Sequence, residues 1–105
     1  MLYRVKAKPK PETLGLFYRA LTDGTILDQK PDGEEIVDSM RRAVATGPGV
    51  IEWYETCYCD TPLAHERQTV FDRYMDGIET VLVNEAEPID GHSFWETLEN
   101  EHSNC

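Results

Sequence analysis

Residues 49–66 read GVIEWYETCYCDTPLAHE, and this stretch decides the fold. Its first half alternates with the two-residue period of a strand, which places Ile51, Trp53, Cys57 and Cys59 on one face and Val50, Tyr54 and Tyr58 on the other. Apolar and aromatic side chains therefore lie on both faces. This pattern predicts a central strand that is either covered on both sides or in contact with a partner subunit.

The second half of the stretch predicts the start of a helix. Asp60 or Thr61 is a suitable N-cap, and Pro62 suits the first helical position. A helical stripe follows, made of Leu63, Val70, Phe71 and Tyr74. An alternative interpretation makes residues 67–75 a strand that forms a hairpin with the central one, and the sequence leaves both open.

The residues before this stretch predict one strand and two helices. Residues 2–8 alternate as a half-buried strand, and apolar residues between 14 and 21 recur at helical spacing. Residues 25–31 are expected to form a loop. A second helix is predicted from the N-cap Asp32, with Glu35 in its first turn, to about Val44, before the breaker Gly47-Pro48-Gly49.

The residues after the stretch predict a strand and a short helix. Residues 78–83 are rich in β-branched and apolar side chains. Ser93 and Glu96 form a capping box for a helix whose Phe94, Trp95 and Leu98 pack on the body. Residues 99–105 are expected to be a polar, frayed tail.

This order of elements predicts an α/β (α+β) two-layer sandwich in a single domain over 1–105, with a small sheet of three to four strands and helices on one face. In size and element order, the chain resembles the ferredoxin-like α+β proteins that dimerise through their sheets. No motif accompanies this resemblance, so it implies no activity or site residue. Because Val50, Tyr54 and Tyr58 are left on the other face, we expect a homodimer.

The composition limits the classes of partner. The 105 residues carry a net charge of −10, with +1 in residues 1–42 and −11 in residues 43–105. An acidic chain lacks the positive surface that binds nucleic acid or an anionic membrane. No apolar run resembles a signal peptide or a membrane span, and three cysteines without an export signal indicate reduced thiols. We therefore expect a soluble cytoplasmic protein.

A metal or thiol site is one hypothesis for the stretch. Cys57, Cys59 and His65, with Glu66 as an optional further ligand, carry ligand types that suit zinc, and His92 or the pair His102 and Cys105 would have to supply a fourth ligand. However, zinc sites usually place two to four residues between paired cysteines, and Cys57 and Cys59 are separated by one. The alternative is that both cysteines pack in the core with Ile51 and Trp53.

A catalytic site is a second hypothesis. His65 could act as a general base with Glu66 or Glu55 beside it. Cys59 is the better candidate for a reactive thiol, because a helix N-terminus is predicted two residues after it. No GxGxxG, P-loop, HExxH or GxSxG signature occurs in the chain, so no catalytic constellation is complete.

Binding of an apolar or aromatic small molecule is a third hypothesis. Trp53, Tyr54, Tyr58 and Tyr74 would line the site, and Arg4 would hold a carboxylate. The sequence thus favours a small binding or regulatory domain over an enzyme. The alternatives are a dimeric α+β enzyme that uses His65 and a metal or thiol-redox protein that uses Cys57, Cys59 and His65.

Overall fold

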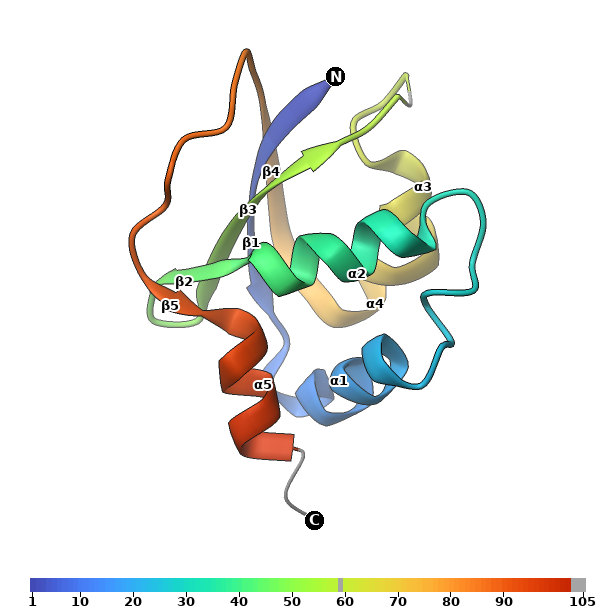
Figure 1. The fold of residues 1–105 in the computed structure, drawn as a ribbon, viewed down its shortest axis with the longest axis vertical. Helices are drawn as coiled ribbons and strands as arrows, with labels where there is room; N and C mark the ends of the chain where they lie inside the picture. The colour runs from blue at the N-terminus through green and yellow to red at the C-terminus, as the bar shows by residue number, and fades with distance from the viewer. Residues whose placement is uncertain (59, 103–105) are drawn as a thin grey trace.

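The structure is a computed structural model that describes residues 1–58 and 60–102. Its elements are β1 (Leu2–Pro9), the 3-10 turn η1 (Pro11–Thr13), α1 (Leu14–Thr22), α2 (Gly33–Arg42), β2 (Val44–Gly47), β3 (Val50–Thr56), α3 (Ala64–Glu66), the π-helical turn η2 (Arg67–Phe71), α4 (Asp72–Tyr74), β4 (Met75–Val83), β5 (His92–Ser93) and α5 (Phe94–His102). The fold is a small mixed α+β domain, as the sequence predicted (Figure 1).

The described strands form one five-stranded antiparallel sheet in the order β4-β1-β3-β2-β5. The prediction of three to four strands was therefore wrong, and the ferredoxin-like arrangement is not confirmed. The strand from the opening stretch, β3, does lie at the centre. The two strands that the sequence did not predict are short: β2 follows α2 directly, and Gly49, with a φ of 69°, closes the β2–β3 hairpin.

Residues 64–74 form one helical segment, α3-η2-α4, in which a π-helical turn separates two short α-helical pieces. The helical interpretation of this region is thus confirmed, and the hairpin alternative is wrong. The start of the segment differs from the prediction. Pro62 is not the first helical residue, because Leu63 precedes Ala64 with a left-handed φ of 58° and a fully buried side chain.

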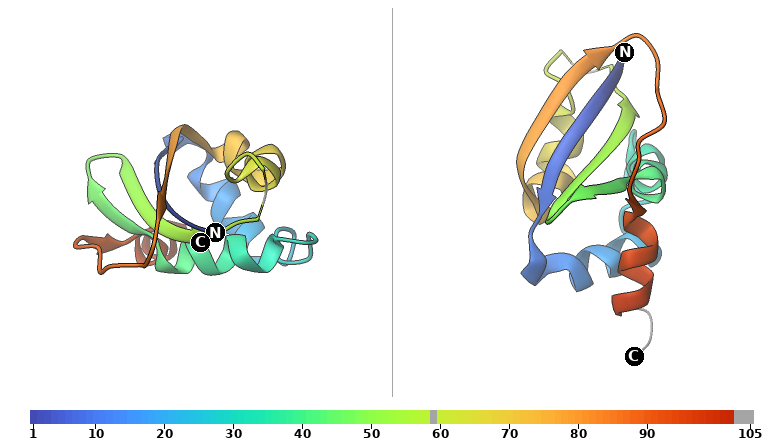
Figure 2. Two further views of the ribbon diagram at one scale, coloured as in Figure 1. Left: turned by 90° about the horizontal axis from the view of Figure 1, so that it is seen from above. Right: turned by 90° about the vertical axis from the view of Figure 1, so that its left-hand side faces the viewer.

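The helices pack on one face of the sheet (Figures 1 and 2). That face contributes alternate buried residues of β1 and β3, among them Val5, Ile51 and Trp53. Trp53 contacts Phe71 from η2 with ring centroids 5.4 Å apart, and Phe17 from α1 stacks on Tyr74 at 4.6 Å. Burial of these large rings supplies much of the driving force for folding.

The opposite face of the sheet is charged, which differs from the apolar surface that the sequence analysis expected. Arg4 forms an ion pair of 3.0 Å with Glu52, and Lys6 lies between Glu52 and Glu79 in the strand register. Val50 and Tyr54 are half-buried, whereas Tyr58, which lies beyond the end of β3, is 85% exposed. The homodimer stays a prediction, but this face does not supply the apolar patch.

The C-terminal helix begins as predicted and extends further. The Glu96 backbone N–H donates to Ser93 Oγ over 3.2 Å, which confirms the Ser93 cap. The helix then continues to His102, so residues 99–102 are not the frayed tail that was expected; residues 103–105 lie outside the described part. Among the described residues, no helix is both long enough and apolar enough to cross a membrane.

Candidate functional site

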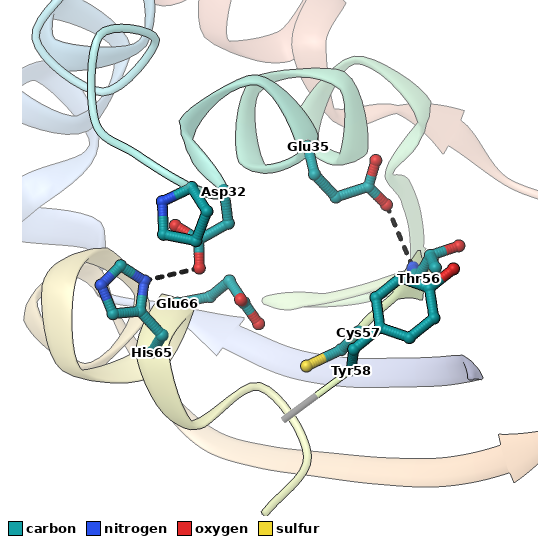
Figure 3. Close-up of a pocket in the computed structure, with 8 residues that line it drawn as sticks. Asp32, Glu35, Thr56, Cys57, Tyr58, His65 and Glu66 are labelled. Atoms are coloured by element: carbon teal, nitrogen blue, oxygen red, sulfur yellow. Dashed lines mark hydrogen bonds and ion pairs between the residues drawn. The ribbon is translucent and has the colours of Figure 1, made fainter. Parts of the chain in front are cut away.

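A cavity of about 470 Å³ opens beside the end of the central strand β3 (Figure 3). Three segments enclose it. The loop before α2 and its first turn contribute Pro31, Asp32 and Glu35, the end of β3 and the residues after it contribute Thr56, Cys57 and Tyr58, and α3 contributes His65 and Glu66. The cavity thus combines residues that lie about 30 positions apart in the chain.

Asp32 and His65 join the two helical segments across this cavity. Their closest atoms, Asp32 Oδ2 and His65 Nδ1, are 2.6 Å apart (Figure 3). Asp32 occupies the N-cap position of α2, as predicted, but its side chain makes no capping hydrogen bond. The carboxylate that was expected to cap the helix instead orients the imidazole of His65.

Glu66 lies beside this pair and is buried, with an exposed fraction of 4%. Burial, together with the hydrogen bond to Asp32 and the charge of Asp32, raises the pKa of Glu66 to about 7, against the lowering effect of its hydrogen bond with Cys57. Burial also raises the pKa of Asp32, but hydrogen bonds with Glu66 and His65 hold it below its ordinary value. Glu66 therefore keeps its proton to a higher pH than an exposed glutamate does, and it loses that proton around neutral pH.

The cluster contains unsatisfied acceptors. Among the described residues, Oδ1 of Asp32 and Oε2 of Glu66 are buried side-chain atoms with no hydrogen-bond partner. Asp32, His65 and Glu66 each present one ligand atom, and these atoms lie within 4.8 Å of one another. This donor set of two carboxylates and one imidazole could hold a divalent metal ion.

A further acid, Glu55, is buried behind the cavity. Alternation along β3 points it into the core with Ile51 and Trp53, and its exposed fraction is 0%. Burial raises the pKa of Glu55 to about 8, against the hydrogen bond of 2.8 Å that Trp53 Nε1 donates to its Oε1. The charges of Glu66 and Glu35 contribute to this rise, so Glu55 keeps its proton to a much higher pH than an exposed glutamate does.

The opposite wall of the cavity is held by Glu35 from α2. Its Oε2 accepts a hydrogen bond of 3.0 Å from the Thr56 backbone N–H. The same oxygen forms an ion pair with Arg42 at 3.5 Å. These contacts fix the end of β3 against α2. Tyr58, at the cavity edge, is 85% exposed and leaves its ring available to a ligand.

The structure separates the residues that the sequence analysis grouped. His65, Glu66, Cys57 and Tyr58 line the cavity. The other candidate ligand-binding residues lie elsewhere: Trp53 and Tyr74 pack in the core, whereas Arg4 and Tyr54 form a hydrogen bond of 3.4 Å on the outer face of the sheet.

The expected metal set is only partly placed. Cys57 is 3% exposed, which agrees with the core interpretation, although it also lines the cavity. Cys59 lies outside the described residues, so its roles as thiol and metal ligand cannot be placed. His65 forms a candidate ligand group with Asp32 and Glu66, and Cys57 lines the same cavity and forms a hydrogen bond with Glu66.

Sequence reasoning missed Asp32 and Glu35, which it assigned only to helix capping. No sequence signal separates them from ordinary residues of a helix N-terminus, because only the fold brings α2 beside His65 and Glu66 of α3. Comparisons with protein-family models, with curated proteins and with solved structures found no match for this chain.

Proposed function

We propose that this chain is a small binding domain whose cavity at the end of β3 takes a small cation. The observation that carries the proposal is the buried Glu66, which is 4% exposed and has an unsatisfied carboxylate oxygen in the cavity wall. A buried carboxylate is costly unless a proton or a positive charge compensates it. A cationic ligand supplies that compensation.

The other residues of the cavity wall also favour a positively charged ligand. Asp32, Glu35 and Glu66 line the cavity, and none of its described lining residues is a lysine or an arginine. An anionic ligand such as a phosphate ester would meet three carboxylates and no fixed positive charge. A cation would instead meet carboxylate oxygens and, at the edge, the exposed ring of Tyr58, whose face attracts positive charge.

The charge of the whole chain favours the same ligand. A net charge of −10 raises the local concentration of cations and speeds their association with the site. General charge is not specific, however, so the proposal rests on the cavity. That the chain is a binding domain rather than an enzyme is part of the same proposal.

The test uses ligands of opposite charge. The full chain is titrated with ZnCl₂, methylammonium chloride and sodium acetate at constant ionic strength, while the backbone amide signals of Thr56, Cys57 and Tyr58 are followed by NMR. We expect saturable shifts with at least one of the two cations and none with acetate. The double variant Asp32→Asn, Glu66→Gln should abolish them, and the exposed Glu85→Gln should not. Saturable shifts with acetate alone, or with no compound, would refute the proposal.

A further inference from the structure

We infer that Asp32, His65 and Glu66 form a binding site for a divalent first-row transition-metal ion, with Zn²⁺ as the best match among common ions. This inference rests on the proposed function, because it names the cation that the cavity takes. It replaces the cysteine-based metal set that the sequence suggested with an oxygen- and nitrogen-based one.

The geometry is close to that of a metal site. The ligand atoms of the three residues lie within 4.8 Å of one another, and they come from the start of α2 and from α3. Zinc binds imidazole nitrogen and carboxylate oxygen at about 2.0–2.2 Å, so tetrahedral ligands are about 3.4 Å apart. The widest pair in the observed group, at up to 4.8 Å, would need to contract by up to about 1.4 Å to reach this spacing, which side-chain rotations can supply.

An independent observation points to a ligand at this place. Glu66 is more than nine-tenths buried, and its Oε2 has no hydrogen-bond partner among the described residues. Asp32 Oδ1 is unsatisfied in the same cluster. Figure 3 shows the Asp32 and His65 side chains pointing toward each other, with Glu66 beside them. An ion held by the three residues would compensate the charge of these buried carboxylates.

The backbone holds the three residues in place without help from a ligand. Leu63, fully buried and with a left-handed φ of 58°, fixes the turn that leads into His65 and Glu66. Thr69 Oγ1 donates to the His65 backbone carbonyl over 2.9 Å. On the other side, Gly33 follows Asp32 and packs against the Ile26 carbonyl. Such support from surrounding groups is what positions metal ligands.

The donor set argues for a transition metal over Mg²⁺ or Ca²⁺. Those hard cations prefer ligand sets made only of oxygen, whereas imidazole nitrogen suits Zn²⁺ and its neighbours. The protein offers three ligands, and the cavity beside them has about 470 Å³ of space. Zinc that is held by three protein ligands keeps an open position for water or a small molecule.

The experiment uses the full chain, first stripped of metal with a chelator and then titrated with ZnCl₂ and MgCl₂ in a calorimeter. We expect one Zn²⁺ per chain and no detectable Mg²⁺ binding. His65→Gln and Glu66→Gln should each weaken Zn²⁺ binding by at least about tenfold. The matched controls His92→Gln and Glu85→Gln change exposed residues outside the cluster and should leave it unchanged.

A second readout ties the ion to His65. NMR of the histidine rings should show a Zn²⁺-dependent change at a ring nitrogen of His65 and none at His92. His65 is partly exposed, so His65→Gln should fold even if Glu66→Gln does not. Unchanged Zn²⁺ binding in His65→Gln would overturn the site.

The outcomes separate this inference from the proposed function. If methylammonium but not Zn²⁺ perturbs the cavity amides, the cation-binding function stands and the metal site is refuted. If neither binds, both are refuted. Zn²⁺ binding that is lost equally in His92→Gln would place the ion elsewhere on the chain and would also refute this site.

Discussion

Among the described residues outside the cavity wall, Glu55 has the pKa that burial raises most. Its side chain is fully buried, and burial raises its pKa from 4.5 to about 8. A carboxyl that is neutral in the folded state and ionised in the unfolded state binds more protons when folded. Between pH 4.5 and 8 the protein therefore loses stability as the pH rises.

Replacing Glu55 with Gln should remove the share of this loss that Glu55 causes and leave the smaller share of Glu66, whose pKa is also raised. The amide keeps an oxygen that can accept the Trp53 Nε1 hydrogen bond but cannot ionise. We expect Glu55→Gln to match the wild-type protein near pH 4.5 and to exceed its unfolding free energy at pH 8.5 by on the order of a few kcal/mol. Urea unfolding at the two pH values measures the difference.

The exposed Glu85→Gln is the control for the effect of removing one negative charge from the chain. It should not change the slope of stability with pH. A wild-type protein that is equally stable at pH 5 and pH 8.5, or an E55Q variant with the same slope as the wild type, would contradict the assignment of this loss to Glu55.

At the scale of elements, Asp32 is positioned by the junction where the preceding loop enters α2. Gly33 is the first residue of α2, and a Cβ there would lie 2.1 Å from the Ile26 carbonyl oxygen and 2.8 Å from that of Leu27. Both atoms are backbone, so the clash cannot be relieved by rotating a side chain. The chain can pass close to itself here only because residue 33 is a glycine.

Gly33→Ala should therefore push the loop away from α2 and lower stability by about 1–3 kcal/mol, the usual cost of overpacking. Gly15→Ala in α1 is the matched control, because its Cβ would meet its nearest neighbour at an ordinary 3.5 Å. Alanine has the higher helix propensity, so Gly15→Ala should be neutral or stabilising by up to about 1 kcal/mol. Thermal unfolding of both variants tests this, and equal stability would contradict it.

The elements with a clear period were predictable, and the short ones were not. The alternation in β1 and β3 and the stripe in α1 survive in the fold because each element buries one face. The sequence did not separate β2 from α2, because Ala43 and Val44 continue the apolar stripe of the helix although the backbone is already extended there. The two residues of β5 are too few to show any period.

The candidate site was predictable in position but not in composition. The junction after β3 does line a cavity, and His65 and Glu66 are in its wall. The role of Asp32 could not be read from the sequence, because an aspartate before a helix is equally suited to capping the backbone or to binding a distant side chain. Only the fold brings α3 close enough for the second role.

At the scale of the whole molecule, the fold places basic residues from the first part of the chain (1–42, net +1) beside acidic residues from the second part (43–105, net −11). The basic strand β1 lies between β3 and β4, so Lys6 has Glu52 and Glu79 as its neighbours in the register. The sheet face is therefore nearly balanced although the chain carries −10. A balanced, charged face is a weak basis for an apolar dimer contact. The edges of the sheet are therefore better candidates for the dimer interface.

The two edges of the sheet differ greatly. β5 has two residues, whereas β4 has nine and pairs only with β1 among the described strands. β4 contains neither lysine nor proline, the residues that commonly protect an edge, and its Val81 and Leu82 are 60% and 56% exposed. Antiparallel pairing of two copies about Thr80 would place Glu79 opposite the partner's Val81, so like charges would not face each other.

If the predicted homodimer forms, this edge is its most favourable contact. We expect sedimentation equilibrium at micromolar concentration to give a dimer mass, and Leu82→Lys to weaken the dimer, because pairing about Thr80 would place the new charge beside the partner's apolar Ile78 on the same face of the sheet. Leu16→Lys, on α1 at 62% exposure, is the matched control and should stay dimeric. A wild-type monomer mass across the concentration range would refute the dimer. A Leu82→Lys variant that dimerises with unchanged affinity would refute this edge, because pairing through β4 would lose the apolar contact between residue 82 and the partner's Ile78.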